Sequence, residues 1–299
     1  MPPTTRTLEI DLAQLTLSAL TWGPDDGPLA LCLHGFPDTA HTWRHLGPQL
    51  GEAGWRVVAP FTRGYAPSGL PRDGSYHVAA LVADAVELHA ALGGDERAVV
   101  VGHDWGAITA NGLGALPSSP YRRVVSMAVP PIPALSAPRP DVLAFVALLP
   151  RQLRMSWYTL FNQLPVLPER HFDRLVRHLW AAWSPGFDAR EDLAHVAAAL
   201  PDRARVAAAV GYYRAASRQW RLPERYADFQ ECWTASPIVP TLYLYGEQDG
   251  CLNPGFGPRV LRSLPPGSEV VAVPDAGHFL QVERPEVVGQ HVVRFLEMS

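Results

Sequence analysis

Hydrophobic residues along the chain form short runs separated by longer amphipathic segments. Apolar runs of the length that a parallel sheet buries on both faces occur at residues 29–33, 56–60, 98–101, 123–129, 241–245 and 269–273. Helical spacing is found between them, for example over residues 77–92, and again in a final helix over 285–297. Two earlier runs, 8–12 and 15–21, predict a hairpin. Alternating strands and helices predict an α/β fold with a mostly parallel sheet flanked by helices.

Residues 130–226 interrupt this alternation. The region opens with the proline-rich stretch PPIPALSAPRP and continues as amphipathic segments that predict helices over 145–160, 169–182, 191–200 and 203–218. A helical block inserted between two sheet strands predicts a cap over the carboxyl edge of the sheet. We therefore expect a core domain of residues 1–130 and 227–299, and a helical cap domain of residues 131–226.

The segment AVVVGHDWGAITA, residues 98–110, predicts a strand, a tight turn and a helix. Its frame has the G-x-S-x-G spacing of the nucleophile elbow of α/β-hydrolases, with Asp104 in the serine position. Taken alone, the frame could be a turn whose aspartate caps a helix. However, Asp249 and His278 also follow predicted strands, and the order of nucleophile, acid and histidine is that of α/β-hydrolases. We interpret the three residues as a catalytic triad.

A second turn, His34-Gly35-Phe36-Pro37, follows the run 29–33. In the α/β-hydrolase arrangement this position supplies one oxyanion-hole N–H, and the residue after the nucleophile supplies the other. We therefore expect the main-chain N–H groups of Phe36 and Trp105 to face one acceptor. Both residues are also candidates for contact with substrate.

A carboxylate in the elbow suits displacement at an sp³ carbon better than attack on a carbonyl. With a reference pKa of about 3.9, an aspartate is ionised at neutral pH and needs no base to activate it. The expected product is an alkyl ester of Asp104. His278, held by Asp249, would then deprotonate a water molecule that attacks this ester, and the oxyanion hole would stabilise the tetrahedral intermediate.

Seven segments resemble the epoxide hydrolases of the α/β-hydrolase fold and occur in the same order: HGFPDTAHTW, RGYAPS, GHDWG, SWYTLFNQLP, GYYR, GEQDGC and DAGHFLQVERPE. They span essentially the whole chain. The resemblance implies that small apolar epoxides are converted with water to vicinal diols, without cofactor or metal. It also implies that two cap tyrosines donate protons to the ring oxygen. By motif these are Tyr158 and Tyr213, with Tyr212 as an adjacent competitor.

Other functions remain open. Haloalkane dehalogenases share the aspartate nucleophile, but they commonly place an asparagine after His-Gly, where this chain has Phe36; Trp105 occurs in both families. A non-catalytic binding protein on this fold is disfavoured by the intact triad, and a carboxylesterase by the lack of serine in the elbow. Trp180 and Trp183 are candidates to line the pocket, although core packing explains them equally well.

Composition limits the possible partners and location. The chain of 299 residues has a net charge of −4 and no basic excess, which argues against nucleic acid. All its basic residues are arginine, so Schiff-base chemistry on lysine is excluded. No apolar run is long enough to span a membrane. Three scattered cysteines and the lack of a signal pattern favour the cytoplasm. A homodimer is left open.

Overall fold

The computed structural model describes residues 5–136 and 142–298, so residues 137–140 at the end of the proline-rich stretch lie outside it. Within the described residues, eight strands form one sheet in the order β1-β2-β4-β3-β5-β6-β7-β8. The pairs β1–β2 and β2–β4 are antiparallel and all others are parallel. The strands are β1 (Arg6–Asp11), β2 (Thr16–Trp22), β3 (Leu29–Leu33), β4 (Arg56–Pro60), β5 (Val99–His103), β6 (Arg123–Met127), β7 (Thr241–Gly246) and β8 (Glu269–Val273).

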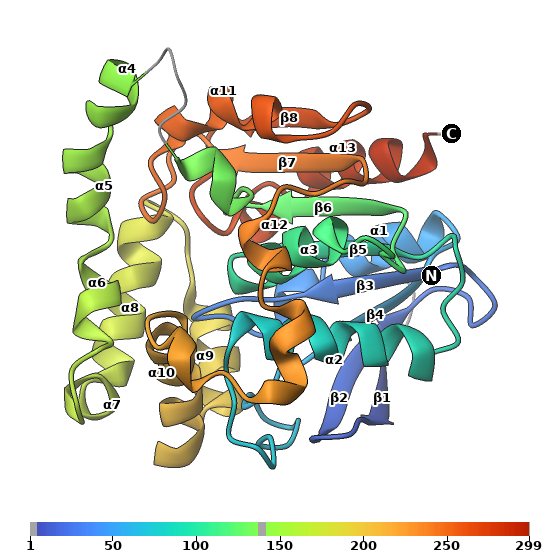
Figure 1. Ribbon diagram of the computed structural model, residues 1–299, viewed down its shortest axis with the longest axis horizontal. Helices are drawn as coiled ribbons and strands as arrows, with labels where there is room; N and C mark the ends of the chain where they lie inside the picture. The colour runs from blue at the N-terminus through green and yellow to red at the C-terminus, as the bar shows by residue number, and fades with distance from the viewer. Residues whose placement is uncertain (1–4, 137–141, 299) are drawn as a thin grey trace.

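Helices lie on both faces of the sheet (Figure 1). On one face α2 (Val78–Ala91) contacts α3 (Trp105–Ala115), and on the other α1 (Leu46–Glu52) contacts α13 (Pro285–Glu297). The central strands β3, β5 and β6 are buried along their whole length, which is why most of their residues are apolar. The predicted α/β fold with a mostly parallel sheet is confirmed.

Seven α-helices follow β6 and precede β7 along the described chain, and they lie beyond the carboxyl ends of the strands (Figure 1). They are α4 (Val142–Val146), α5 (Leu149–Met155), α6 (Trp157–Phe161), α7 (Leu167–Arg170), α8 (Phe172–Trp183), α9 (Arg190–Ala199) and α10 (Arg203–Ala216). We call this group the cap; the domain boundaries at residues 130 and 226 stay predictions.

The single helix predicted over 145–160 is wrong, because the chain forms α4, α5 and α6 there. Pro150 stands in the first turn of α5, where its missing N–H costs nothing, whereas inside a longer helix it would remove a hydrogen bond. Ser156 separates α5 from α6.

The remaining elements are short. The 3₁₀ helices η3 (Gln219–Arg221), η4 (Glu224–Phe229) and η5 (Cys232–Thr234) lead from the cap to β7, and α11 (Gly257–Val260) and α12 (Leu280–Glu283) flank β8. Of the helices in the described part of the chain, none is both long and apolar enough to cross a bilayer.

Candidate active site

Asp104 lies on the turn between β5 and α3 with φ 52° and ψ −116°. This left-handed backbone is unfavourable for a residue with a Cβ and is found mainly where function requires it. The turn is possible because its flanking residues are glycines. A Cβ on Gly106 would meet the carbonyl oxygen of Leu33, and a Cβ on Gly102 would meet that of Gly106. The predicted elbow is present, and it presents the carboxylate of Asp104 beyond the end of β5.

One oxygen of Asp104 is already held. The main-chain N–H of Phe36, on the turn after the neighbouring strand β3, donates to Oδ1 of Asp104 at 2.8 Å. Trp105 begins α3, so its N–H lies at a helix N-terminus, where negative charge is stabilised. Phe36 N–H is therefore placed as an oxyanion-hole donor should be, with Oδ1 as its acceptor, and Oδ2 remains for chemistry.

His278 lies between two carboxylates. Its Nδ1 is 3.0 Å from Oδ2 of Asp249, and its Nε2 is 3.7 Å from Oδ2 of Asp104. All three side chains are buried. Oδ1 of Asp249 accepts the main-chain N–H groups of Cys251 and Leu252, which fixes the carboxylate. A carboxylate oxygen accepts, so Nδ1 is the protonated nitrogen and Nε2 faces Asp104.

The charge state of His278 depends on its neighbours. Burial alone would lower the pKa of His278, because a low-dielectric interior disfavours the imidazolium. The adjacent carboxylates of Asp249 and Asp104 outweigh burial, and the pKa of His278 lies well above its usual value. An ester at Asp104 would remove one of these negative neighbours. The pKa of His278 would then fall, and the imidazole could act as a base in the step that follows.

Both predicted tyrosines line one cavity with Asp104. The cavity has a volume of about 460 Å³ and is lined mostly by apolar residues, among them Trp105, Ile108, Val129, Ile132, Leu135 and Leu160. Tyr158, from α6, and Tyr213, from α10, enter it from the cap. Burial raises the pKa of each well above that of a free tyrosine, and the nearby Asp104 raises it further. Both are therefore neutral O–H donors at neutral pH.

The structure distinguishes the adjacent tyrosines of GYYR. The hydroxyl of Tyr212 donates to the carbonyl oxygen of Arg63 at 2.8 Å, away from the cavity. The hydroxyl of Tyr213 is buried and has no hydrogen-bond partner among the described residues. The rings of Tyr213 and Tyr158 pack edge to face with centroids 5.6 Å apart. Tyr213 is thus the member of the pair that can reach a ligand beside Asp104.

The predicted substrate contacts of Trp180, Trp183 and the Phe36 side chain receive no support, because none of the three is among the described residues that line the cavity. Trp180 stacks on Phe279 and donates its Nε1–H to the carbonyl oxygen of Pro37 at 2.9 Å. Trp183 packs edge to face against His278, and its carbonyl oxygen accepts the His278 N–H at 2.9 Å. Both tryptophans therefore pack against residues around the site and lie outside the cavity lining.

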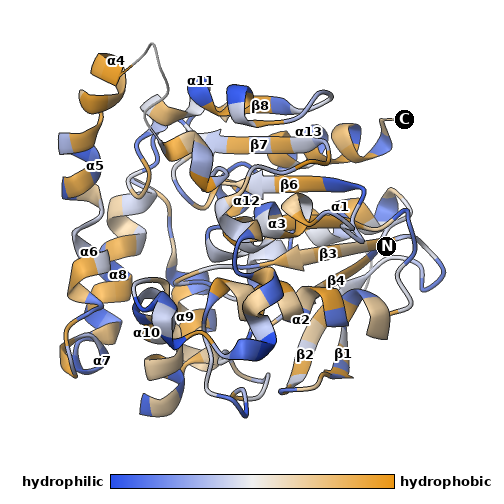
Figure 2. Ribbon diagram, viewed as in Figure 1, coloured by the Kyte–Doolittle hydropathy of each residue, from blue (hydrophilic) through white to orange (hydrophobic). Residues whose placement is uncertain are grey.

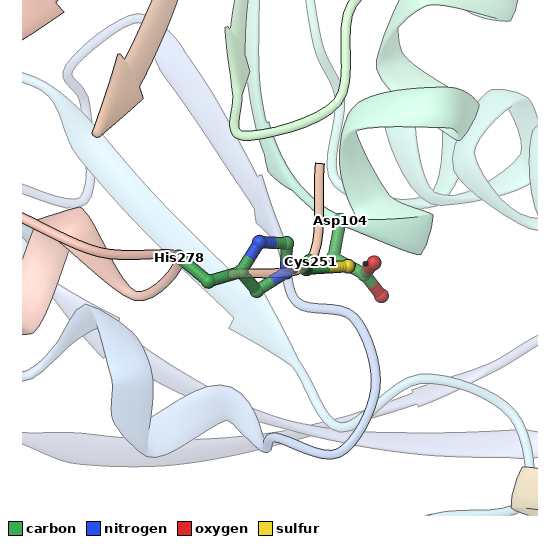
Figure 3. A group of neighbouring side chains, drawn as sticks. All are labelled: Asp104, Cys251 and His278. Carbon is green, nitrogen blue, oxygen red and sulfur yellow. Dashed lines mark ion pairs between the residues drawn. The ribbon is translucent and has the colours of Figure 1, made fainter. Parts of the chain in front are cut away.

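Cys251 is a residue that the sequence did not single out as functional. It lines the cavity, and its thiol lies beside Asp104 and His278 (Figure 3). One ligand atom from each of these three residues falls within 4.8 Å of the others, a donor set that could hold a metal ion. Two of the three belong to the proposed triad, so an ion there would compete with the proposed chemistry. The sequence feature that could have identified Cys251 is its position, two residues after Asp249.

A second buried acid–histidine pair lies behind the triad. Oδ2 of Asp38, just after the HGFP turn, is 3.8 Å from Nδ1 of His103. Nε2 of His103 is 2.9 Å from the carbonyl oxygen of His278. Burial, and then the charge of Asp192, raise the pKa of Asp38 to about 7, while burial lowers the pKa of His103 to about 3. Both side chains are neutral over much of the acidic range.

The fold and the position of Asp104 define a class: an α/β-hydrolase-type protein whose elbow carries a carboxylate in place of a hydroxyl. Residues 28–285 match the family described as alpha/beta hydrolase fold, and the chain belongs to that family. The recognition of the fold from sequence is confirmed.

Curated relatives and solved structures are similar over nearly the whole chain. Epoxide hydrolase A of Mycobacterium tuberculosis is 30% identical, over 96% of this chain and 96% of its own. The AB hydrolase superfamily protein YfhM of Bacillus subtilis is 29% identical, with 95% of each chain covered. Among solved structures, epoxide hydrolase A of Mycobacterium thermoresistibile superposes with a TM-score of 0.75 at 28% identity, with 98% of each chain covered. These relatives support a hydrolase.

Proposed function

We propose that this protein is an epoxide hydrolase that converts small apolar epoxides to vicinal diols through an ester on Asp104. The observation that carries the proposal is the shared cavity: Asp104, Tyr158 and Tyr213 all line it. A nucleophile and two neutral proton donors thus face one apolar space. Relatives named epoxide hydrolases support the same reading.

The first step opens the ring. Oδ2 of Asp104 attacks a ring carbon, because Oδ1 is occupied by the N–H of Phe36. As the new C–O bond forms, the ring C–O bond breaks and its electron pair goes to the ring oxygen. That oxygen becomes strongly basic and takes a proton from Tyr158 or Tyr213, which is left as a tyrosinate. General acid catalysis of this kind contributes about 10²–10⁴-fold.

The second step hydrolyses the ester. Nε2 of His278 removes a proton from water, and the hydroxide attacks Cγ of Asp104. The negative charge of the tetrahedral intermediate develops on Oδ1, which already accepts the N–H of Phe36 at 2.8 Å. Collapse breaks the ester bond and releases the diol oxygen. Protons from the imidazolium and the new carboxylic acid neutralise the alkoxide and the tyrosinate, so the net reaction adds one water molecule.

The test is intact-protein mass spectrometry of His278→Gln, incubated separately with a panel of epoxides and a panel of primary haloalkanes. Without its base the ester should accumulate. The proposal expects a mass gain equal to the whole epoxide, mapped to Asp104. Absence of an epoxide adduct at Asp104, when the haloalkane panel does react, would overturn it.

A dehalogenase is the second candidate, and one observation is compatible with it. Nε1 of Trp105 is buried without a hydrogen-bond partner among the described residues, and Trp105 lines the cavity. This N–H could donate to a leaving halide. A mass gain of the alkyl group alone, from the haloalkane panel only, would select this function. A non-catalytic binding protein would give no adduct with either panel.

A further inference from the structure

The outer edge of the cap carries an exposed apolar stripe. Helices α4, α5 and α6 follow one another as a rod along one edge of the molecule (Figure 1), and much of this rod is apolar (Figure 2). Leu143, Leu153 and Leu160 are 87%, 73% and 75% exposed, and Val146 and Trp157 are 49% and 42% exposed. The five side chains are exposed on three successive helices of the rod. We call these five residues the α4–α6 stripe.

The charged residues within the segment that carries the stripe are positive. From residue 142 to residue 168 the sequence has no aspartate or glutamate, and its charged residues are Arg151 and Arg154. Both are exposed, and neither has an ion-pair partner within the described part of the chain. The exposed Asp173 of α8 is 3.0 Å from Arg177.

A shallow cleft extends this surface onto α8. It has a volume of about 260 Å³, and its lining combines Trp157 and Phe161 with Arg174 and the two histidines His171 and His178. Aromatic residues beside cationic ones are typical of surfaces that lie at the headgroup level of a bilayer. The stripe and the cleft meet at Trp157.

The positive charge of the segment that carries the stripe distinguishes between two candidate binding partners, a second copy of the chain and a lipid bilayer. A second copy of the chain would bring another Arg151 and Arg154 against the first pair, with no carboxylate between residues 142 and 168 to offset them. An anionic bilayer supplies the missing negative charge at its surface and an apolar layer beneath it. Such a surface attracts adjacent arginines.

The stripe is continuous with the cavity. Leu160 is 75% exposed and also lines the cavity, together with Thr159 on the same helix. We propose that the α4–α6 stripe docks on the surface of an anionic lipid bilayer, and that apolar substrate passes from the lipid into the cavity beside Leu160. The delivery of substrate rests on the proposed function, whereas the lipid contact does not.

The lipid contact is tested without substrate, by sedimentation of the full chain with vesicles. One set contains phosphatidylcholine alone, and the other contains phosphatidylcholine with phosphatidylglycerol. We expect binding to the anionic vesicles that weakens as salt is raised. The double variant Leu143→Ser/Leu153→Ser should bind at least about tenfold more weakly, because two exposed leucines no longer enter the lipid. Arg151→Gln/Arg154→Gln should lose about tenfold on anionic vesicles and little on the neutral ones.

The matched control is Ile238→Ser/Leu261→Ser, which removes two apolar side chains of 58% and 51% exposure outside the cap helices. It should bind like the unsubstituted chain. No binding to anionic vesicles, or an equal loss in the control, would overturn the proposal. So would a dimer in light scattering that Leu143→Ser/Leu153→Ser converts to a monomer while vesicles bind neither form. Because no turnover is measured, failure of the proposed hydrolase activity would leave this result unchanged.

Discussion

The hydroxyl of Tyr158 lies 3.3 Å from Sγ of Cys251, within hydrogen-bond distance. The N–H of Cys251 in turn donates to Oδ1 of Asp249 at 2.6 Å. A single turn after β7 therefore fixes the acid that orients His278 and also contacts a proposed proton donor. Burial raises the pKa of the Cys251 thiol, so the group that faces Tyr158 is a neutral thiol and not a thiolate.

This contact predicts a positioning role for Cys251. Cys251→Ala removes the partner of the Tyr158 hydroxyl, and we expect the rate of ester formation to fall by about 2- to 10-fold, the usual value of one neutral hydrogen bond. Cys251→Ser keeps a hydrogen-bonding group and should restore most of the rate. Single-turnover rates with an epoxide measure the effect. If Ser and Ala behave alike, the thiol acts through packing alone.

The two cavity tyrosines should be separable from their neighbour by substitution. We expect Tyr158→Phe and Tyr213→Phe each to slow ring opening about 10- to 100-fold, since one donor remains, and the double variant to lose the full contribution of general acid catalysis. Tyr212→Phe is the matched control. Its hydroxyl donates to the Arg63 carbonyl, so we expect a loss of about 1 kcal/mol in the free energy of unfolding and little change in ring opening. Rapid-quench kinetics and urea unfolding measure the two effects.

The sequence predicted the bounds of strands best, because packing within the sheet determines which residue types occur there. The bounds predicted for the runs 29–33, 56–60 and 269–273 agree with β3, β4 and β8, because each strand is mostly apolar, even though β4 and β8 begin at a charged residue and β8 is only partly buried. The cap was harder to predict. Amphipathic spacing continues through Pro150 and Ser156, so the pattern predicted one helix where tertiary packing allows three.

Residues of the candidate site were predictable when their position in the chain determined their place in space. Asp104, Asp249 and His278 each follow a strand of one parallel sheet, and such loops meet at one edge. Side-chain direction was not predictable in this way. Cap helices approach the sheet through tertiary contacts, so the sequence could not show that Trp180 stacks on Phe279 and lies outside the cavity lining.

Asp38 should make the stability of the fold depend on pH. Burial raises its pKa in the folded state to about 7, compared with 3.8 for a free aspartate. Between these values the unfolded chain has lost the proton that the folded chain retains, so stability falls as pH rises through this window, by up to about 4 kcal/mol. Asp38→Asn has no proton to lose and should show a flatter profile. Urea unfolding of both proteins at several values between pH 4 and 7 measures the difference; parallel profiles would contradict the prediction.

Asp249→Asn should separate the two chemical steps. The Asn oxygen can still accept the N–H groups of Cys251 and Leu252, but its amide would donate to Nδ1 of His278, and the proton of the imidazole would then lie on Nε2. Nε2 could no longer act as a base. Ring opening needs Asp104 and a tyrosine hydroxyl, so we expect it to change less than about tenfold. Ester hydrolysis should fall by about 10³–10⁴-fold, as for the equivalent change of tautomer in serine hydrolases.

The measurement for this variant is a burst in which one equivalent of epoxide is consumed per active site without release of diol, with a lasting adduct on Asp104 in the intact mass. His278→Gln should give the same adduct and serves as the positive control. If both steps fall together and no ester accumulates, Asp249 supports the fold of the β7 turn and not the base. That outcome has a structural rationale, because Oδ1 of Asp249 holds two main-chain N–H groups of the turn. The ratio of the two step rates, rather than overall activity, therefore decides the role of Asp249.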